Sequence, residues 1–377
     1  MFYRFDSARA AFAYYLNKRV NLLTGLEELY PVHLFNQSLE REVIAKESLN
    51  PRVTHLFYEY SFVVEKLESE LTGDELLAIE IEYEKAQEFS WNENSKKIQF
   101  DLVEEIDFKS YQEKFKTGFQ ELLKGNCYQF NLTSPSFYRF DQSCSEKDFY
   151  EILWKKKENV AAFAHFTFIG LWNKAYLSNS PECLFELSSN TLVTKPIKGT
   201  LKRESDDPKE IKVLWEKLQS DSKNQAELFM ITDLLRNDLS RINIPNAKVV
   251  AAKKMLLVPN LIHQYSEISI DLKKDTTLKQ ILFALFPGGS ITGAPKKNSI
   301  RIIKKLEKDQ REFYCGSTIL HFQENLKASI NIRSAEINLS SYILKYSSGG
   351  GITLKSEIKD EFSELIHKKV SFFSLFS

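Results

Sequence analysis

The chain has 377 residues, of which 43% are hydrophobic, so it is long enough for one large domain or two ordinary ones with a real core. Its 51 Lys and Arg residues balance its 51 Asp and Glu residues. A formal charge of zero argues against a nucleic-acid-binding protein, which usually carries a basic excess, so recognition by charge must be local.

The N-terminal hundred residues are predicted to form mixed strands and helices, and they carry no chemical signature. From about Asp107 the pattern sharpens. A helix is predicted through Tyr111–Leu123 because Lys124-Gly125 supplies a stop. Cys127–Thr133 then alternates between apolar and polar residues, which is typical of a strand.

Two helices are predicted in the middle of the chain. Asp207 supplies an N-cap and Pro208 a first helical residue for a helix through Leu218. A second helix, roughly Lys223–Ile242, follows it. Its apolar stripe consists of Leu228, Ile231, Leu235, Leu239 and Ile242.

A glycine-rich loop, FPGGSITGAP, precedes a helix that Pro295 opens and that runs through Glu307. Strands are predicted at Ala328–Ile337 and at Tyr342–Ser348, before three glycines. A last helix, about Asp360–Phe373, is expected to bury Phe362, Ile366, Val370 and Phe373. Long strands that interleave irregularly with helices favour an α+β fold with antiparallel sheets over a doubly wound one.

The two glycine-rich stretches are not nucleotide motifs. GGSITGAPK continues as Ala-Pro-Lys where a phosphate-binding loop needs Gly-Lys-Ser/Thr, and GGGITLKS lacks the third glycine of the dinucleotide fingerprint. A helix N-terminus after such a loop would still suit a carboxylate or a phosphate. A tight structural turn explains the glycines equally well.

Three glutamates and one lysine are candidates for chemistry. Glu361 and Glu364 share one face of the last helix, where solvated surface charges are the simpler interpretation. Glu227 starts the apolar part of its helix, and a buried carboxylate there would need a partner such as Mg²⁺. Lys198 lies in an extended segment, and as a nucleophile it would need burial or a nearby cation, whereas most lysines lie on the surface.

Three further residues are ambiguous when taken singly. Arg333 is placed on the polar face of a predicted strand, where a buried arginine would bind an anion. His263 and Tyr314 are more typical of packing residues.

Eight segments in order carry a resemblance: GNCYQFNLT, SPECLFEL, TKPIKGT, AELFMITDLLRNDLSRI, FPGGSITGAPK, REFYCGSTI, NIRSAEI and SSGGGITLKSEIKDEFSE. They closely resemble the chorismate-utilising family: anthranilate synthase component I, aminodeoxychorismate synthase component I, and isochorismate and salicylate synthases. The resemblance implies an α+β fold of two packed antiparallel sheets with helices outside. Residues 1–104 would form the N-terminal portion of that fold and residues 105–377 its chorismate-binding catalytic region.

The resemblance also implies roles for individual residues. Glu227 and Glu364, with Glu361 adjacent, match ligands of a Mg²⁺ ion that holds the ring carboxylate of chorismate. Glu182 matches a general acid, and His263 matches a histidine near the reacting ring. Further positions match residues that bind the substrate: Gly199, Thr200, Tyr314, Arg333, Gly349, Gly351 and Lys368.

Two positions bear on the reaction. Gln129 stands where isochorismate and salicylate synthases use a lysine to activate water, so attack by water is disfavoured. Lys198 lies in Pro-Ile-Lys-Gly-Thr, which resembles aminodeoxychorismate synthases, whereas anthranilate synthases resemble Pro-Ile-Ala-Gly-Thr. The resemblance thus implies amination of chorismate at C4 through a covalent Lys198 intermediate, as a step toward 4-aminobenzoate and folate. Anthranilate synthesis and a catalytically silent regulatory copy are the alternatives.

The remaining expectations concern partners and location. None of the four cysteines lies in a G-x-C-x-G motif, so a glutamine amidotransferase subunit is expected to supply ammonia, and a separate lyase to release pyruvate. The cysteines form no C-x-x-C pair, and the longest apolar stretch, Val160 to Trp172, is shorter than the ~20 residues of a membrane span. No signal peptide is apparent, so a cytoplasmic protein is expected. The segment FDSA near position 6 resembles only faintly the one that lines a tryptophan pocket in relatives, which leaves tryptophan binding open.

Overall fold

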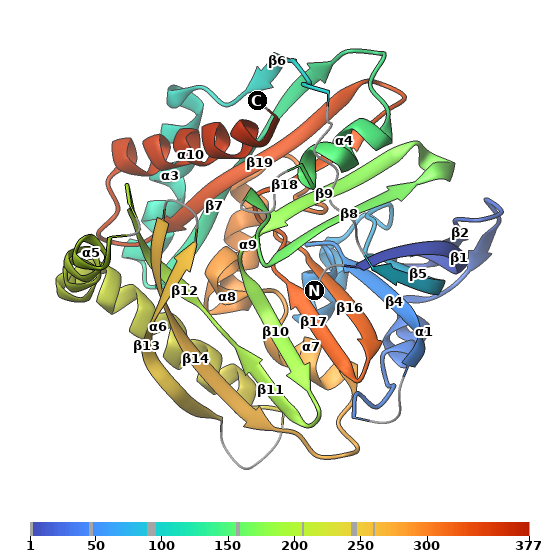
Figure 1. The fold of residues 1–377 in the computed structure, drawn as a ribbon, viewed down its shortest axis with the longest axis horizontal. Helices are drawn as coiled ribbons and strands as arrows, with labels where there is room; N and C mark the ends of the chain where they lie inside the picture. Colours follow the sequence, from blue (N-terminus) through green and yellow to red (C-terminus); the bar gives the residue numbers. More distant parts are fainter. Residues whose placement is uncertain are drawn as a thin grey trace.

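The computed structural model describes residues 3–44, 48–88, 96–155, 159–205, 207–242, 247–258 and 261–376. Their strands form two sheets, and the strand pairs within both are antiparallel. Figure 1 shows the two sheets with helices around them.

The larger sheet contains twelve strands of the described residues, ordered β12-β14-β11-β10-β17-β16-β4-β5-β1-β2-β3, with β13 also paired to β14. These strands are β1 (Tyr3–Tyr14), β2 (Lys18–Asn21), β3 (Glu27–Leu29), β4 (Ser48–Leu56), β5 (Ala78–Glu88), β10 (Cys183–Ser188), β11 (Thr191–Thr194), β12 (Ile197–Lys202), β13 (Lys248–Val258), β14 (Leu261–Asp271), β16 (Ser317–Gln323) and β17 (Asn325–Ser329). The N-terminal strands therefore extend the sheet that also carries β12 and β14.

The smaller sheet has seven strands in the same part of the chain, ordered β15-β7-β19-β18-β9-β8, with β6 paired to β7. These strands are β6 (Phe100–Glu105), β7 (Gln129–Phe140), β8 (Phe163–Ile169), β9 (Lys174–Ser180), β15 (Gly293–Ala294), β18 (Ser334–Asn338) and β19 (Ile343–Ile352). The long β7–β19 ladder brings Gly349 opposite Thr133 and Gly351 opposite Asn131.

Helices cover both sheets. They are α1 (Val32–Ser38), α2 (Tyr60–Val64), α3 (Phe108–Leu123), α4 (Glu146–Leu153), α5 (Pro208–Ser220), α6 (Ser222–Ser240), α7 (Leu278–Leu285), α8 (Gly289–Thr292), α9 (Lys296–Leu306) and α10 (Ile358–Phe373). α3 and α10 lie side by side over β7 and β19, while α6 packs along β12 and β14 (Figure 1). None of the described helices is long and apolar enough to cross a membrane.

The two sheets share an aromatic core. Phe57 follows β4 of the larger sheet, and its ring centroid lies 5.6 Å from that of Tyr176 on β9 of the smaller one. The ring of Phe313 lies 5.0 Å from Tyr176, and all three side chains are buried. This packing confirms the expected α+β fold of two antiparallel sheets with helices outside.

Three local predictions were wrong. The strand expected over Ala328–Ile337 is broken into β17 and β18, because the chain turns at Arg333 with a φ of 49°. β19 continues through the three glycines instead of stopping before them. In the last helix Val370 is 62% exposed, and the fully buried side chains are Glu361, Leu365 and Phe372, while the expected Phe362, Ile366 and Phe373 pack partly buried against the core.

Candidate active site

A bulge in β12 positions Lys198. Ile197 pairs with Tyr265 and Thr200 pairs with His263, so β12 has one more residue than β14 between these pairs. Gly199 takes up the irregularity with a φ of 84°, in the region that favours glycine. The Lys198 side chain is half-buried, and its amine bonds to none of the described residues, whereas the Lys195 amine pairs with Glu186 at 2.5 Å.

The register of the same strands brings Thr200 and His263 together. Thr200 Oγ1 lies 2.7 Å from His263 Nδ1. Burial, and then the positive charge of Arg333, lower the pKa of His263 to about 4. The imidazole is therefore neutral near pH 7, so it can exchange hydrogen bonds without adding a charge to the site.

Glu182 is held by the glycine-rich loop. The Ser290 hydroxyl on α8 donates a hydrogen bond to Glu182 Oε1 at 2.7 Å, and Asn131 Nδ2 donates to the Ser290 carbonyl at 3.4 Å. α8 contacts α6 on one side and β7 and β19 on the other. Ser290 was not predicted as a site residue, although its motif was noted for the backbone amides at its helix start.

The C-terminal helix brings two carboxylates over β19. A Cβ atom built on Gly350 would lie 3.0 Å from Glu361 Oε2 and 3.7 Å from Glu364 Oε1. Glu361 is only 7% exposed, so the interpretation of a solvated surface charge is wrong for it. Lys368 pairs with Glu364 at 2.6 Å and donates to the Gly349 carbonyl at 2.7 Å.

The neighbouring glycine accommodates Gln129. A Cβ on Gly351 would lie 2.5 Å from Gln129 Nε2, so the buried carboxamide packs directly over the β19 backbone. The structure therefore groups Gln129, Gly349, Gly351 and the α10 carboxylates on the smaller sheet.

Arg333 lies between the two groups of predicted residues. Its charge acts on His263 in the larger sheet and on Tyr346 in β19 of the smaller one. Tyr314, in the turn before β16, is buried, and burial is the main reason that its phenol pKa is well above the usual value.

Metal binding by three carboxylates is not apparent in the described part of the chain, where no cluster of three acidic, His or Cys side chains forms. Glu227 is half-buried on α6, which packs against β12, β14 and α8. The Glu361 and Glu364 carboxylates nevertheless both lie near Gly350, and carboxylate oxygens are the ligands that a hard divalent cation prefers. The Lys368 ammonium, which pairs with Glu364, occupies part of this position in the structure.

A cavity of about 1030 Å³ lies apart from these residues. Phe5 and Asp6 of the FDSA segment line it, together with His165 on β8 and Tyr150 on α4. No residue that the sequence predicted for the chorismate site lines this cavity.

The fold and the grouped residues define an enzyme class. Residues 9–374 match the family model described as chorismate binding enzyme, and the chain belongs to this family. Its fold resembles that of anthranilate synthase component I from Streptococcus pneumoniae TIGR4, with a TM-score of 0.77 at 19% identity over 99% of this chain and 92% of that one.

Curated relatives named for two different reactions are similar in sequence to this chain. Aminodeoxychorismate synthase component 1 of Escherichia coli strain K12 is 36% identical over 68% of this chain and 55% of its own length. Anthranilate synthase component 1 of Archaeoglobus fulgidus is 31% identical over 68% of this chain and 60% of its own. The match thus spans little more than half the length of the E. coli relative.

Proposed function

We propose that this protein aminates chorismate at C4 to give 4-amino-4-deoxychorismate, with Lys198 as the nucleophile. The observation that carries the proposal is the β12 bulge, which presents a lysine without a bonded partner among the described residues beside the Thr200–His263 pair. The similarity to the E. coli aminodeoxychorismate synthase component supports the same reaction.

The chemistry requires two displacements. The Lys198 amine, once it has given its proton to solvent, attacks C2. Both ring double bonds shift toward C4, and the C4 hydroxyl leaves as water after it accepts a proton from Glu182. Ammonia then attacks C4, both double bonds shift back, and the lysine amine leaves from C2. A nucleophile that divides one difficult displacement into two easier ones is the logic of covalent catalysis.

The other residues bind and orient the substrate. Arg333 would pair with a substrate carboxylate between the sheets, and the neutral His263 would contact the ring without competing for that carboxylate. Glu361 and Glu364 would hold Mg²⁺, which when bound would neutralise the ring carboxylate of chorismate, and Glu227 on α6 would join them only if the bound ion drew the three carboxylates together. Gln129 offers no base for water, which favours the amine pathway.

Mass spectrometry of the products tests the proposal. Wild-type protein with chorismate, ammonium and Mg²⁺ should form a product with the mass of aminodeoxychorismate, and Lys198→Ala should lower that rate by at least about a hundredfold. Lys195→Ala is the matched control, because its amine is held by Glu186, and it should retain activity. Anthranilate from the wild type would refute the assignment and favour the alternative that the Archaeoglobus relative represents.

Ammonia delivery gives a second test. We expect the chain alone to use ammonium and to use glutamine only when an amidotransferase subunit is added, since no cysteine lies in a G-x-C-x-G motif. Release of glutamate from glutamine by the pure chain would contradict this. Chorismate binding without turnover would favour a silent regulatory copy instead. We also expect pyruvate release to require a separate lyase.

A further inference from the structure

The Arg311 guanidinium is buried, and its bonds reach three segments of the chain. It forms a two-bond ion pair with Glu307 at 2.7 Å, and both side chains are less than a tenth exposed. Nη1 donates to the Ile291 carbonyl at 2.8 Å, and Nη2 donates to the Asn131 carbonyl at 2.7 Å. The guanidinium also lies over the Tyr58 ring, 4.5 Å from its centroid.

Each carbonyl that Arg311 binds lies within two residues, along the chain, of a residue in the candidate site. Ile291 follows Ser290, whose hydroxyl holds Glu182. Asn131 lies two residues from Gln129 on the same face of β7. The backbone of Arg311 itself begins the turn that carries Tyr314, whose N–H donates to the Arg311 carbonyl at 3.2 Å.

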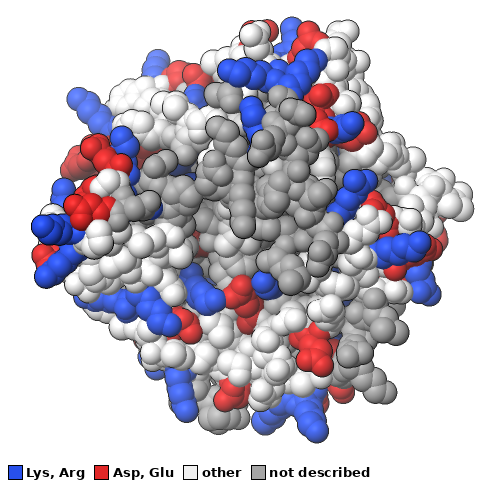
Figure 2. Space-filling view, in the orientation of Figure 1, with Lys and Arg blue, Asp and Glu red and all other residues white. Residues whose placement is uncertain are grey.

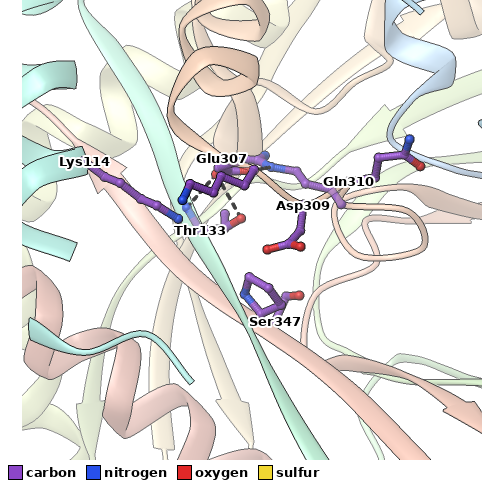
Figure 3. Close-up of a pocket in the computed structure, with 9 residues that line it drawn as sticks. Lys114, Thr133, Glu307, Asp309, Gln310 and Ser347 are labelled. Carbon is purple, nitrogen blue, oxygen red and sulfur yellow. Dashed lines mark hydrogen bonds and ion pairs between the residues drawn. The ribbon is translucent and has the colours of Figure 1, made fainter. Parts of the chain in front are cut away.

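Glu307 extends the connection to β19. It accepts hydrogen bonds from the Thr133 backbone N–H at 2.8 Å and from the Thr133 hydroxyl at 3.0 Å, and Thr133 pairs with Gly349 across the ladder. Figure 3 shows Glu307 directed at Thr133, beside a small cavity of about 10 Å³. The ion pair thus joins the glycine-rich loop, β7 and the Tyr314 turn.

We propose that Arg311 is a positioning residue, which holds the Ser290–Glu182 contact and the Tyr314 turn in register with β7. The role requires a guanidinium, which is planar and here donates two hydrogen bonds to the Glu307 carboxylate and one to each of two carbonyls. A lysine ammonium does not reproduce this arrangement. A buried ion pair adds little net stability over an apolar pair of the same shape, so a geometric role accounts better for its presence here. The proposal rests on the proposed function, since it acts through Glu182.

A double-mutant cycle tests it with Arg311→Lys, Ser290→Ala and the double variant. Arg311→Lys should lower kcat for chorismate consumption by about tenfold in the wild-type background. In the Ser290→Ala background the same change should lower kcat by less than about twofold, because both residues act on Glu182. Equal factors in the two backgrounds, or a fall in kcat that only follows the loss of folded protein in thermal melts, would overturn the proposal.

Arg41→Lys is the matched control. Arg41 is a largely buried arginine that pairs with Glu80 at 3.2 Å in the N-terminal part of the larger sheet. Its effect on kcat should be small and the same with or without Ser290→Ala, because distant sites are independent. An effect that depends on Ser290 to the same degree as that of Arg311→Lys would also overturn the proposal.

The readout separates this proposal from the proposed function. The Arg311 proposal is tested by the rate of chorismate consumption, which does not depend on the identity of the product. The proposed amination is tested separately, by the mass of the wild-type product. If the wild type consumes no chorismate, the proposed function fails, and the Arg311 variant is then judged by calorimetric binding of chorismate. Binding about tenfold weaker at an unchanged melting temperature would support the positioning role through Tyr314 and Gln129, and unchanged binding would overturn it.

Discussion

Among single residues, Gly199 is the one whose backbone conformation most directly determines where the proposed nucleophile, Lys198, is placed. Its φ of 84° suits glycine, and a Cβ there would lie 2.9 Å from the buried Gln264 carboxamide. Gly199→Ala should therefore cost about 1 kcal/mol of unfolding free energy from the backbone alone and should also displace the Lys198 bulge.

Gly125→Ala is the control for this prediction. Gly125 has a φ of 75°, and no atom lies within 4 Å of the position of a Cβ. Both variants should unfold at lower urea concentration, but only Gly199→Ala should lose chorismate turnover. Equal turnover in the two variants would show that the bulge does not position Lys198.

Gly350 offers a second test at this scale, directed at the metal. A methyl group at this position would press on Glu361 Oε2, which lies 3.0 Å from the Cβ position. Gly350→Ala should raise the Mg²⁺ concentration for half-maximal activity by about tenfold, because misplaced carboxylates bind the cation less well. Gly170→Ala, where the nearest atom is 3.9 Å away, should leave the Mg²⁺ titration unchanged. An unaltered titration in Gly350→Ala would exclude Glu361 as a ligand.

At the scale of elements, a buried ion pair joins α9 to α6. Lys296 Nζ lies 2.9 Å from Asp238 Oδ2, and both side chains are almost fully buried. Lys296→Met should lower the free energy of unfolding by about 3 kcal/mol, because the buried Asp238 carboxylate loses its buried partner and keeps only the exposed Arg241, at 3.6 Å. Chemical denaturation measures this.

The double replacement Lys296→Met/Asp238→Leu should recover most of that loss, since no unpaired buried charge remains and Arg241, which also pairs with Asp238, is exposed to solvent. Arg236→Ala, in the exposed pair with Asp233 on the same helix, should cost less than about 1 kcal/mol. A loss in Lys296→Met no larger than in Arg236→Ala would show that the buried pair does not stabilise the α6–α9 contact.

Helices and strands were predicted most reliably where the residues that determine them are close together in the sequence. The starts of α5 and α6 follow from short-range caps: Asp207 accepts from the Lys209 N–H and Asp221 from the Asn224 N–H, both at 3.0 Å. α10 was found, and Phe362, Ile366 and Phe373 pack against the core as expected. Val370 is exposed instead, and Phe372, which stacks on Tyr346 of a distant strand, was missed. The break at Arg333 has no glycine or proline to mark it.

At the scale of the whole molecule, buried histidines determine the response to acid. Burial is the largest cause that lowers the pKa of His165, His263 and His321 to about 4, and it lowers the pKa of His55 as well. Between pH 4 and 6.5 the unfolded chain binds these protons and the folded chain does not. Their contribution to stability is complete above pH 6.5 and is lost as the pH falls toward 4.

Two buried carboxyl groups oppose this trend. Burial raises the pKa of Glu59 and of Glu336 to about 7, so their contribution is present at low pH and is lost as the pH rises from 4.5 to 7. The histidines outnumber them, so urea denaturation should show a less stable protein at pH 4.5 than at pH 6.5. Glu336→Gln should gain stability relative to wild type on going from pH 5 to pH 8. A constant difference would show that Glu336 is not protonated in the folded state.

The surface is consistent with the balanced composition. On the face in Figure 2, the described Lys and Arg side chains alternate with Asp and Glu around the rim, and no large region carries one sign. Recognition by local charge, as at Arg333 between β17 and β18, stays a prediction.

The family, the fold class, most helices and most candidate residues followed from the amino-acid order, because collinear motifs, caps and periodicity are properties of neighbouring residues. The contacts between these residues, and the supporting residues Ser290 and Arg311, became apparent only from the folded chain. Ser290 reaches Glu182 across 108 residues of chain, and Arg311 reaches the Asn131 carbonyl across 180. Spacing along the chain does not encode such contacts, because they depend on how two sheets and the loops between them pack.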